Sequence, residues 1–391
     1  MDLLKVDREI LSLMKINATA VIGTGFIGAV HIEAIRRTGN YVKGVLSGSE
    51  KSTLQATAKY KIKTAYSSID EICSDKDVSV VHVTSPNALH VEQVEKLIAA
   101  KKHVVCEKPL ALTAAEGAHL LKLATEAGIT HALCFNTRFY PMVHEAQSRF
   151  HNKEIGELRY IHAQYHQDWL ALDTDWNWRL ESEKAGGLRA VADIGSHLLD
   201  QLNFITGEEI ESVFADLHTL IKVRNRPMGE VQTFTSSSNA DRKEVPMSSD
   251  DAAGLVLRFR NGARATISIS QISFGSKNAI KWEISGTKAS LSFDSEEPES
   301  LIMGNRGSGN EIIRKDPSLL SSSAAGITFY PGGHVEGFGE TFRGLFETVY
   351  NHIENPTAEI KFPTFADGVQ SLELTDAIAE SSKTATWVKL K

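Results

Sequence analysis

Apolar and polar residues alternate along the first third of the chain in a pattern that predicts strands and helices in turn. Short apolar runs are each followed by a longer stretch with helical spacing. The predicted strands are residues 18–23, 41–46, 78–84, 103–106 and 130–135, and helices are predicted up to residue 37 and over 53–60, 89–100 and 113–127. The run at 78–84 is almost continuously apolar, which is typical of a strand buried on both faces. This alternation predicts a doubly wound parallel sheet.

The pattern changes after Asn136, where strand-like runs begin to dominate. Strands are predicted over residues 158–166, 255–260, 263–270, 281–285 and 289–293, a helix over 193–206, and Ser-rich loops over 236–249 and 304–325. Asn261-Gly262 between two of these strands is a type I′ hairpin signal. Residues 365–387 form a long helical segment that can return to the first domain. We expect an α/β second domain with one large, open, mostly antiparallel sheet and helices on one face.

Composition and charge argue against a nucleic-acid-binding or membrane protein. The chain has 391 residues and a formal net charge of −7. This length predicts two or three domains, and a mildly acidic chain is a poor candidate for nonspecific binding to nucleic acid or to anionic membranes. No run of about 18 apolar residues predicts a transmembrane span. Charged residues interrupt the first 15 positions, unlike a signal peptide, so we expect a cytoplasmic protein.

We predict no metal site and no disulfide framework. Cys73, Cys106 and Cys134 have no CxxC spacing and are expected to be reduced and mostly buried. His162 and His166 lie four residues apart on one face of a predicted strand. They lack a third ligand or a carboxylate partner, so metal binding is not expected there.

The sequence GTGFIG at residues 23–28 follows a predicted strand and opens a predicted helix, the context that a dinucleotide-binding turn requires. Gly23 would allow the tight turn, Gly25 would let the backbone approach a pyrophosphate, and Gly28 would permit close helix–strand packing. The helix N-terminus would supply N–H donors. We therefore expect this turn, with Phe26 and Ile27, to bind a dinucleotide.

The end of the second predicted strand indicates which cofactor is bound. NAD-binding proteins commonly place a carboxylate there to bind the ribose 2′-hydroxyl. Here the sequence is LSGSEK, in which Ser47, Ser49 and Lys51 could hold a 2′-phosphate while Glu50 comes later. We therefore favour NADP(H) over NAD(H). The alternative is an ordinary turn with a solvated Lys51.

The triplet Glu107-Lys108-Pro109 directly follows a predicted strand of the sheet that carries the nucleotide turn. Ligands bind beyond the carboxyl ends of parallel strands, so these side chains are expected near the cofactor. Surface charge is the simpler reading of an isolated Glu-Lys pair.

A second candidate is DIGSHLLD at residues 193–200, in which Asp193 is a plausible helix N-cap and His197 lies one turn later. By themselves these two residues fit a capping Asp and a buried structural His at least as well.

Together these motifs resemble the Gfo/Idh/MocA oxidoreductases, the relatives of glucose–fructose oxidoreductase and inositol dehydrogenase. The resemblance rests on residues 23–28, 84–90, 107–109 and 185–200 and extends from about Met14 to the C-terminus. It implies a Rossmann domain over residues 14–136 and a substrate-binding and oligomerisation domain over 137–391, with residues 1–13 as an extension or an upstream start. It also implies that Lys108, Asp193 and His197 lie at the substrate hydroxyl.

Other residues are weaker candidates. Those expected to approach the cofactor, from their place after the predicted strands 78–84 and 103–106, are Ser85, Pro86, Asn87, His90 and Glu107. Those expected near the substrate are Arg138, Trp176, Trp178, Arg179 and His334. A hinge role for Arg138 and simple core packing for the two Trp residues are equally open alternatives.

The expected activity is hydride transfer between NAD(P) and a secondary hydroxyl or ketone of a sugar, anhydrosugar, glycoside or cyclitol. His197 is the candidate base and Lys108 would stabilise the developing alkoxide, although the proton could pass to either. Two alternatives stay open: a glycosidase of the same fold that oxidises and re-reduces its substrate, and a non-catalytic nucleotide sensor. The expected partner is a small polyhydroxylated molecule, and we expect a homodimer or homotetramer formed through the second sheet.

Overall fold

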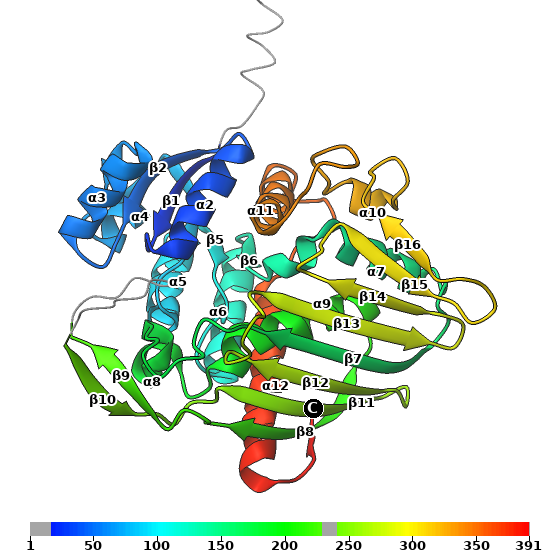
Figure 1. Ribbon diagram of the computed structural model, residues 1–391. Coiled ribbons are helices and arrows are strands. Elements are labelled where there is room, and N and C mark those ends of the chain that lie inside the picture. Colours follow the sequence, from blue (N-terminus) through cyan, green and yellow to red (C-terminus); the bar gives the residue numbers. More distant parts are fainter. Residues whose placement is uncertain (1–16, 229–240, 391) are drawn as a thin grey trace, which may run out of the picture.

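The computed structural model describes residues 17–228 and 241–390, which form two large sheets with their helices and one two-stranded sheet (Figure 1). The first sheet is parallel, with strand order β3-β2-β1-β4-β5-β6. Its strands are β1 (Ala18–Ile22), β2 (Tyr41–Leu46), β3 (Thr64–Ala65), β4 (Val78–Val83), β5 (His103–Cys106) and β6 (His131–Leu133). The strand order reverses between β1 and β4. The crevice beyond the carboxyl ends of these two strands is therefore the expected ligand site.

Helices from both ends of the chain cover this first sheet. Those from its own segment are α2 (Phe26–Arg37), α3 (Glu50–Tyr60), α4 (Ile69–Ser74), α5 (His90–Ala99) and α6 (Ala114–Ala127), with the short turn η1 (Asn87–Leu89) before α5. Two helices arrive from the far end of the chain. Helix α11 (Phe338–Glu354) packs on α2, and α12 (Phe365–Thr384) packs on α6. Phe342 and Phe346 of α11 share a buried core with Val21 of β1, so late residues complete the early domain.

The second sheet is mixed and has strand order β16-β15-β14-β13-β7-β12-β11-β8-β17. Its strands are β7 (Leu158–His166), β8 (Ile210–His218), β11 (Ala252–Phe259), β12 (Arg264–Ser270), β13 (Ala279–Gly286), β14 (Ser290–Asp294), β15 (Ser300–Gly304), β16 (Glu311–Arg314) and β17 (Val388–Lys389). Strands β7 and β12 pair in parallel, and the other neighbouring pairs are antiparallel. A separate antiparallel pair is formed by β9 (Val223–Pro227) and β10 (Arg242–Pro246).

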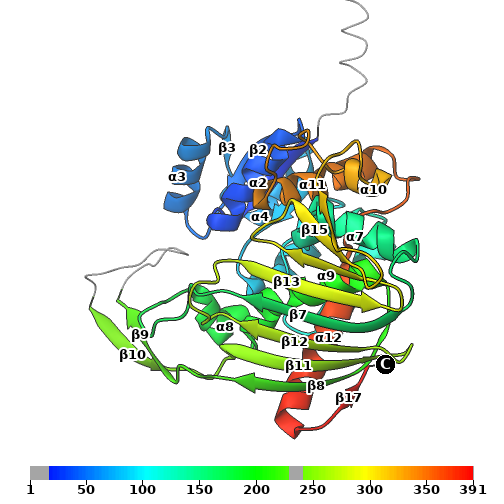
Figure 2. The same ribbon diagram turned by 45° about the vertical axis from the view of Figure 1, so that its right-hand side comes forward.

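Helices cover one face of the second sheet, and the other face is turned outward (Figure 2). The covering elements are α7 (Pro141–His151), the π-helical turn η4 (Val191–Gly195), α9 (Ser196–Thr206) and α12. Along β12, Ile267 and Ile269 are buried beneath them, whereas Thr266 is half-buried and Ser268 is exposed. The remaining short elements are η2 (Asn136–Phe139), η3 (Trp178–Leu180), α8 (Ser182–Ala185) and α10 (Ser322–Ala325).

The predicted α/β class and both types of sheet are confirmed, but several local predictions differ from the structure. The two Ser-rich stretches are not loops throughout, because the first contains β10 and the second contains β16 and α10. The hairpin at Asn261-Gly262 exists, but Gly262 has a positive φ and Asn261 does not, so the turn is not type I′. The predicted extension, residues 1–13, lies outside the described residues. None of the described helices is both long and apolar enough to cross a bilayer.

Candidate active site

The glycine-rich turn between β1 and α2 contains the close approaches expected from its sequence. Gly23 has φ +91°, and a Cβ there would lie 2.6 Å from the Thr84 carbonyl oxygen. A Cβ on Gly28 would lie 2.2 Å from the Gly23 carbonyl oxygen. A Cβ on Gly25 would meet nothing within 4 Å, so the space beside this residue is open. An open Gly25 at the first turn of α2 fits a backbone that a pyrophosphate approaches closely.

The turn after β2 has no carboxylate at the strand end. Ser47, which follows the strand directly, exchanges a hydrogen bond with Thr24 of the glycine-rich turn. Ser49 caps α3 by accepting a hydrogen bond from the backbone N–H of Ser52. Lys51 is exposed, as is Glu50 at the first position of α3. Hydroxyl groups and one lysine therefore surround the place where an adenosine ribose would lie, together with one exposed acid.

The segment after β4 is bonded to the segment after β5. The ring nitrogens of the buried His90 lie 2.9 Å from the Ser85 carbonyl oxygen and 2.8 Å from the Pro109 carbonyl oxygen. Asn87 donates its amide to the Ala185 carbonyl oxygen of α8, and Pro86 precedes η1. The Lys108–Pro109 peptide bond is cis. His90 thus holds two backbone segments together with both of its ring nitrogens. We therefore assign it a structural role rather than a contact with the cofactor.

Lys108 and Asp193 form the centre of the site. Lys108 Nζ lies 2.9 Å from Asp193 Oδ1 and 2.5 Å from the Asp193 carbonyl oxygen. Arg179 Nε donates to the same Oδ1 over 3.0 Å, and Gln271 Nε2 donates to Oδ2 over 2.8 Å. Burial by itself would raise the pKa of Asp193, but the charges of Arg179 and Lys108 lower it well below its usual value. Asp193 is therefore a carboxylate that fixes the positions of two cations.

His197 lies next to this group and is 8% exposed. Burial, and then the charge of Lys108, lower its pKa to about 3, so the imidazole is neutral near pH 7. The Nδ1 atom is buried without a hydrogen-bond partner among the described residues. The ring packs edge-on against Phe135, with centroids 5.8 Å apart. A neutral imidazole that is not already bonded at Nδ1 can accept a proton or orient a hydroxyl group.

The backbone around Asp193 differs from the sequence prediction. Asp193 lies within η4, and Gly195 is the N-cap of α9, so the N-cap interpretation of Asp193 is wrong. A π-helical turn contains one residue more than an α-turn, and such turns are frequent at functional sites. Here the turn directs the Asp193 carboxylate toward Lys108 while His197 stays on the first turn of α9. Helical spacing alone does not reveal this feature.

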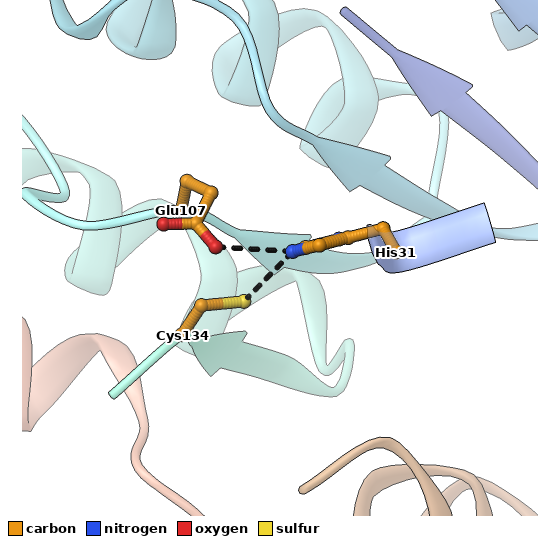
Figure 3. Close-up of side chains that lie close together, drawn as sticks. All are labelled: His31, Glu107 and Cys134. Atoms are coloured by element: carbon orange, nitrogen blue, oxygen red, sulfur yellow. Dashed lines mark hydrogen bonds and ion pairs between the residues drawn. The ribbon is translucent and has the colours of Figure 1, made fainter. Parts of the chain in front are cut away.

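Glu107 is bonded on its other side to residues that the sequence analysis did not associate with it (Figure 3). Its Oε1 lies 3.0 Å from His31 Nε2, and its Oε2 accepts the backbone N–H of Lys108 over 3.3 Å. Burial would raise the pKa of Glu107, but the hydrogen bond from His31 lowers it, helped by the charge of Lys108. Cys134 Sγ lies 3.8 Å from the same His31 nitrogen. His31, Glu107 and Cys134 place one potential metal-binding atom each within 4.8 Å of one another.

These groups open into a cleft of about 290 Å³ between the two sheets. The cleft is lined by seven residues predicted from the sequence: Phe26, Ile27, Glu107, Lys108, Arg179, Asp193 and His197. It is also lined by residues that no sequence pattern singled out: Tyr165, Gln167, Trp169, Ile194, Lys277, Asn278, Phe338 and Phe342. Tyr165 OH and Gln167 Nε2 each donate to Asn278 Oδ1 over 2.7 Å, and Trp169 donates to Gln167 Oε1 over 2.7 Å. The position of Gln167 and Trp169 just after β7 is the signal that could have identified them.

Several expected substrate residues do not line this cleft. Arg138 is buried and donates to Asp200 and Asp367. Trp176 is buried in a small core with Leu170 and Leu180, the packing alternative stated above. Trp178 is half-buried beneath the guanidinium of Arg179, 4.6 Å from its ring centre. His334 lies on an exposed loop. We therefore do not include Arg138, Trp176, Trp178 or His334 in the site.

A larger cavity, of about 420 Å³, lies elsewhere, between α9 and α12. Its lining includes Asp200, Arg260 and Asp367 but none of Lys108, Asp193 and His197. Size alone therefore does not identify the site. The smaller cleft has the convergent charged groups at the carboxyl ends of the first sheet's strands, which is the stronger criterion for chemistry.

Both parts of the chain match models of known protein families. Residues 18–134 match the oxidoreductase family model with an NAD-binding Rossmann fold, and residues 143–292 match the GFO/IDH/MocA C-terminal domain. The 1,5-anhydro-D-fructose reductase of Ensifer adhaerens is 32% identical over 329 residues, which cover 81% of this chain and 89% of the relative. The chain belongs to the Gfo/Idh/MocA family.

Other relatives extend over almost the whole chain. Levoglucosan dehydrogenase of Pseudarthrobacter phenanthrenivorans is 27% identical over 383 residues, covering 94% of this chain and 96% of that protein. The crystal structure of an oxidoreductase domain protein from Kribbella flavida is 30% identical and has a TM-score of 0.87, covering 97% of this chain and all of that one. A levoglucosan dehydrogenase complex with NADH and levoglucosan has a TM-score of 0.86 at 27% identity, covering 96% of this chain and all of that one. This Gfo/Idh/MocA protein is an NAD(P)-binding oxidoreductase with sugar, anhydrosugar and cyclitol dehydrogenases among its relatives.

Proposed function

We propose that the protein transfers a hydride between NAD(P) and a secondary carbinol of a sugar, anhydrosugar, glycoside or cyclitol. The observation that carries this proposal is the grouping of Lys108, Asp193 and the neutral His197 in one cleft beside the glycine-rich turn. The bound cofactor would supply the hydride acceptor. The chain's own residues would bind the hydroxyl group, stabilise its developing charge and receive its proton.

Each of the three residues has a separate task in this proposal. The Lys108 ammonium stabilises the alkoxide that develops as the hydride leaves the carbinol carbon. Asp193 keeps Lys108 and Arg179 in place through its carboxylate. His197 is neutral over the physiological range and is the proposed proton acceptor. Since the positive charge of Lys108 disfavours a protonated His197, the proton must leave His197 again after the hydride has been transferred.

The cleft wall supports a substrate with several hydroxyl groups. Asn278 accepts two hydrogen bonds at its carbonyl oxygen, from Tyr165 and Gln167. Its amide NH₂ group is then the part available to a substrate oxygen. The Trp169 ring contributes an apolar surface beside these polar groups. Sugars and cyclitols offer this combination of C–H faces and hydroxyl groups.

We further propose NADP(H) as the preferred cofactor, because no carboxylate stands directly at the end of β2, and Ser47, Ser49 and Lys51 lie in the following turn and the start of α3. Dissociation constants for NADP(H) and NAD(H) test this preference directly. Lys51→Ala should weaken binding of NADP(H) and leave NAD(H) nearly unchanged. Tighter binding of NAD(H) by the unaltered protein would contradict the proposal, and the exposed Glu50 would then be the group to replace.

A panel of sugars, anhydrosugars, glycosides and cyclitols, assayed at 340 nm with both cofactors, tests the reaction. Net formation or consumption of the reduced nicotinamide supports the dehydrogenase function. Release of an aglycone without a net change at 340 nm would instead identify the cofactor-retaining glycosidase. Binding of the cofactor without turnover of any compound would favour the nucleotide sensor.

The cellular setting and assembly are also proposals. The three cysteines are unpaired, which fits a reducing compartment such as the cytoplasm. The outward face of the second sheet carries alternating side chains such as Tyr160, Thr266 and Ser268. We propose that a second copy of the chain covers this face in a homodimer or homotetramer.

A further inference from the structure

A row of buried polar side chains leads away from the cleft through the interior of the first domain. Tyr350 OH lies 2.7 Å from His82 Nε2, and His82 Nδ1 lies 3.0 Å from His31 Nδ1. His31 Nε2 lies 3.0 Å from Glu107 Oε1 at the cleft. Both histidines are fully buried, and Tyr350 is 2% exposed. Four side chains from α11, β4, α2 and the end of β5 thus form one continuous hydrogen-bond chain.

The protonation states give this chain a direction. An ionised Glu107 can only accept, so His31 must carry the proton on Nε2. Burial lowers the pKa of His82 well below its usual value, so His82 carries one proton. Burial also raises the pKa of Tyr350, which keeps its hydroxyl proton. When Tyr350 donates to His82 Nε2 and His82 Nδ1 donates to His31 Nδ1, every nitrogen in the chain is bonded and no buried cation is required.

The reverse order is physically less favourable. It would place a second proton on His31, whose ring is enclosed by Phe342 and Phe346 at centroid distances of 5.4 and 4.7 Å. That proton would make His31 a fully buried cation and would cancel the charge of Glu107. In the favoured order His31 accepts at Nδ1 and donates from Nε2, and Glu107 keeps its full negative charge at the cleft.

We propose that the Tyr350–His82–His31 chain holds Glu107 as an anion beside the nicotinamide and thereby favours binding of the oxidised cofactor over the reduced one. This inference rests on the proposed position of the nicotinamide, because Glu107 shares the cleft with Phe26 and Ile27 of the glycine-rich turn and with Lys108. The oxidised nicotinamide ring is cationic and the reduced ring is neutral. A fixed carboxylate therefore stabilises the oxidised form selectively. His31, His82 and Tyr350 are positioning residues in this scheme.

The contact between Cys134 and His31 also allows a different reading, a metal ion held by His31, Glu107 and Cys134. One feature disfavours it. The His31 nitrogen nearest the other two groups already bonds to Glu107. The hydrogen-bond chain accounts for all the polar atoms without an ion.

The test measures dissociation constants of the oxidised and reduced cofactor, by calorimetry and by nicotinamide fluorescence, on the full-length protein. Glu107→Gln should weaken binding of the oxidised form relative to the reduced form by about fivefold or more, the effect of one unit charge about 4 Å away even in water. His82→Phe keeps the ring that packs on Phe346, and Tyr350→Phe removes one hydroxyl group. Both substitutions should shift the ratio of the two dissociation constants, oxidised cofactor to reduced cofactor, in the same direction as Glu107→Gln, by a smaller factor.

Tyr66→Phe is the matched control, because it also removes a buried tyrosine hydroxyl that donates over 2.7 Å, in this case to Asp75. It should leave the ratio unchanged. An unchanged ratio in Glu107→Gln would overturn the proposal. A shift in Glu107→Gln with none in either His82→Phe or Tyr350→Phe would show that the charge acts but the chain does not, which also overturns it. Tyr350→Phe decides the question even where His82→Phe fails to fold.

Further outcomes distinguish a failure of this inference from a failure of the proposed reaction. Stoichiometric metal in the purified protein, bound through Cys134, would show that His31, Glu107 and Cys134 form a metal site, and would overturn the proposed hydrogen-bond chain. Because cofactor binding needs no sugar, a shifted ratio in a protein that turns over no compound of the panel would uphold the inference while the proposed reaction fails. Normal turnover with an unchanged ratio in Glu107→Gln would uphold the proposed reaction and overturn the inference about Glu107.

Discussion

At the scale of single residues, the site depends on how burial and neighbouring charges set protonation. Asp193 is ionised because two cations surround it, and His197 is neutral because it is buried beside one of them. Neither state follows from the residue type alone. The same carboxylate and imidazole on an exposed helix would keep ordinary pKa values and hold no lysine in place.

Replacing the reacting groups should separate their tasks. Lys108→Ala and His197→Ala are each expected to reduce turnover by roughly 10²-fold or more, the lower range for general acid–base and charge-stabilising groups, while cofactor binding persists. Lys108→Arg keeps the positive charge but cannot release a proton, so it should retain more turnover than Lys108→Ala. Steady-state kinetics and cofactor titration provide the measurements.

The controls for this series are residues with the same chemistry outside the cleft. Lys122→Ala on α6 removes a lysine that is 73% exposed, and His119→Ala removes a histidine that is 53% exposed. Both should leave turnover unchanged. Near-normal turnover in His197→Ala would exclude it as the base, and equal loss in Lys108→Arg and Lys108→Ala would assign the proton to Lys108.

A buried histidine far from the cleft should make the protein sensitive to acid. Burial, and then the charge of Arg138, lower the pKa of His144 to about 3. Between pH 6.5 and 3 the unfolded chain binds a proton there that the folded chain does not, so the free energy of unfolding falls as the pH falls. The free energy of unfolding should therefore fall by about 2 kcal/mol less between pH 7 and pH 5 in His144→Gln than in the unaltered protein.

Urea unfolding at both pH values measures this difference. His119→Gln serves as the control because it makes the same exchange at an imidazole that is 53% exposed. An identical loss of unfolding free energy in His144→Gln and the unaltered protein would contradict the prediction.

At the scale of elements, a local change in helix geometry brings two functional groups into one cleft. The π-helical turn η4 lets Asp193 and His197 face the same cleft from one continuous helical segment. Gln271, directly after β12, fixes the second carboxylate oxygen of Asp193 and itself accepts from the buried Arg189. The helix spacing predicted the pair of residues, but the turn and this support came from the structure.

The glycine-rich turn offers a matched pair of substitutions. Gly28→Ala would place a Cβ 2.2 Å from a backbone oxygen, so it should destabilise the fold by about 1–3 kcal/mol through overpacking. Gly25→Ala meets nothing within 4 Å and should fold with normal stability. It should nevertheless weaken cofactor binding, because the added methyl group occupies the space that the pyrophosphate requires.

Thermal unfolding without cofactor and a cofactor titration distinguish the two effects. Normal cofactor affinity in Gly25→Ala would show that the pyrophosphate does not approach this residue. Normal stability in Gly28→Ala would mean that the turn relaxes to admit the methyl group.

At the scale of the whole molecule, the chain returns to its first domain after building the second. Helices α11 and α12 complete the cover of the first sheet, and α11 supplies Phe338 and Phe342 to the cleft and Tyr350 to the buried chain. The cleft therefore depends on residues more than 300 positions apart, such as Phe26 and Phe338, whose rings stack with centroids 6.4 Å apart.

The outward face of the second sheet leads to a prediction about assembly. Light scattering at micromolar concentration is expected to give two or four times the chain mass of 42.9 kDa. Thr266→Lys and Ser268→Lys on neighbouring outward positions of β12 should lower that mass, because two copies would then bring like charges together. A mass of one chain for the unaltered protein would refute the proposed oligomer.

The sequence by itself determined what depends on near neighbours along the chain. Strand and helix periodicity, the spacing of Gly23, Gly25 and Gly28, and the position of Lys108 after a buried strand are local properties, and the corresponding elements appear in the structure. Local signals failed where a residue's role depended on what packs beside it. Trp176 was expected to bind the substrate but is buried in a small core, whereas Trp169, which no sequence pattern singled out, lines the cleft.

Only the tertiary structure decided which distant groups meet. Arg138 bonds to Asp200 and Asp367, 62 and 229 positions away, and His82 bonds to Tyr350, 268 positions away. No periodicity links such pairs, because their distance is set by how helices from the end of the chain pack on a sheet formed at its beginning. The charge of Glu107 and the neutrality of His197 follow from that packing, since burial and the neighbouring charges that it brings fix both protonation states.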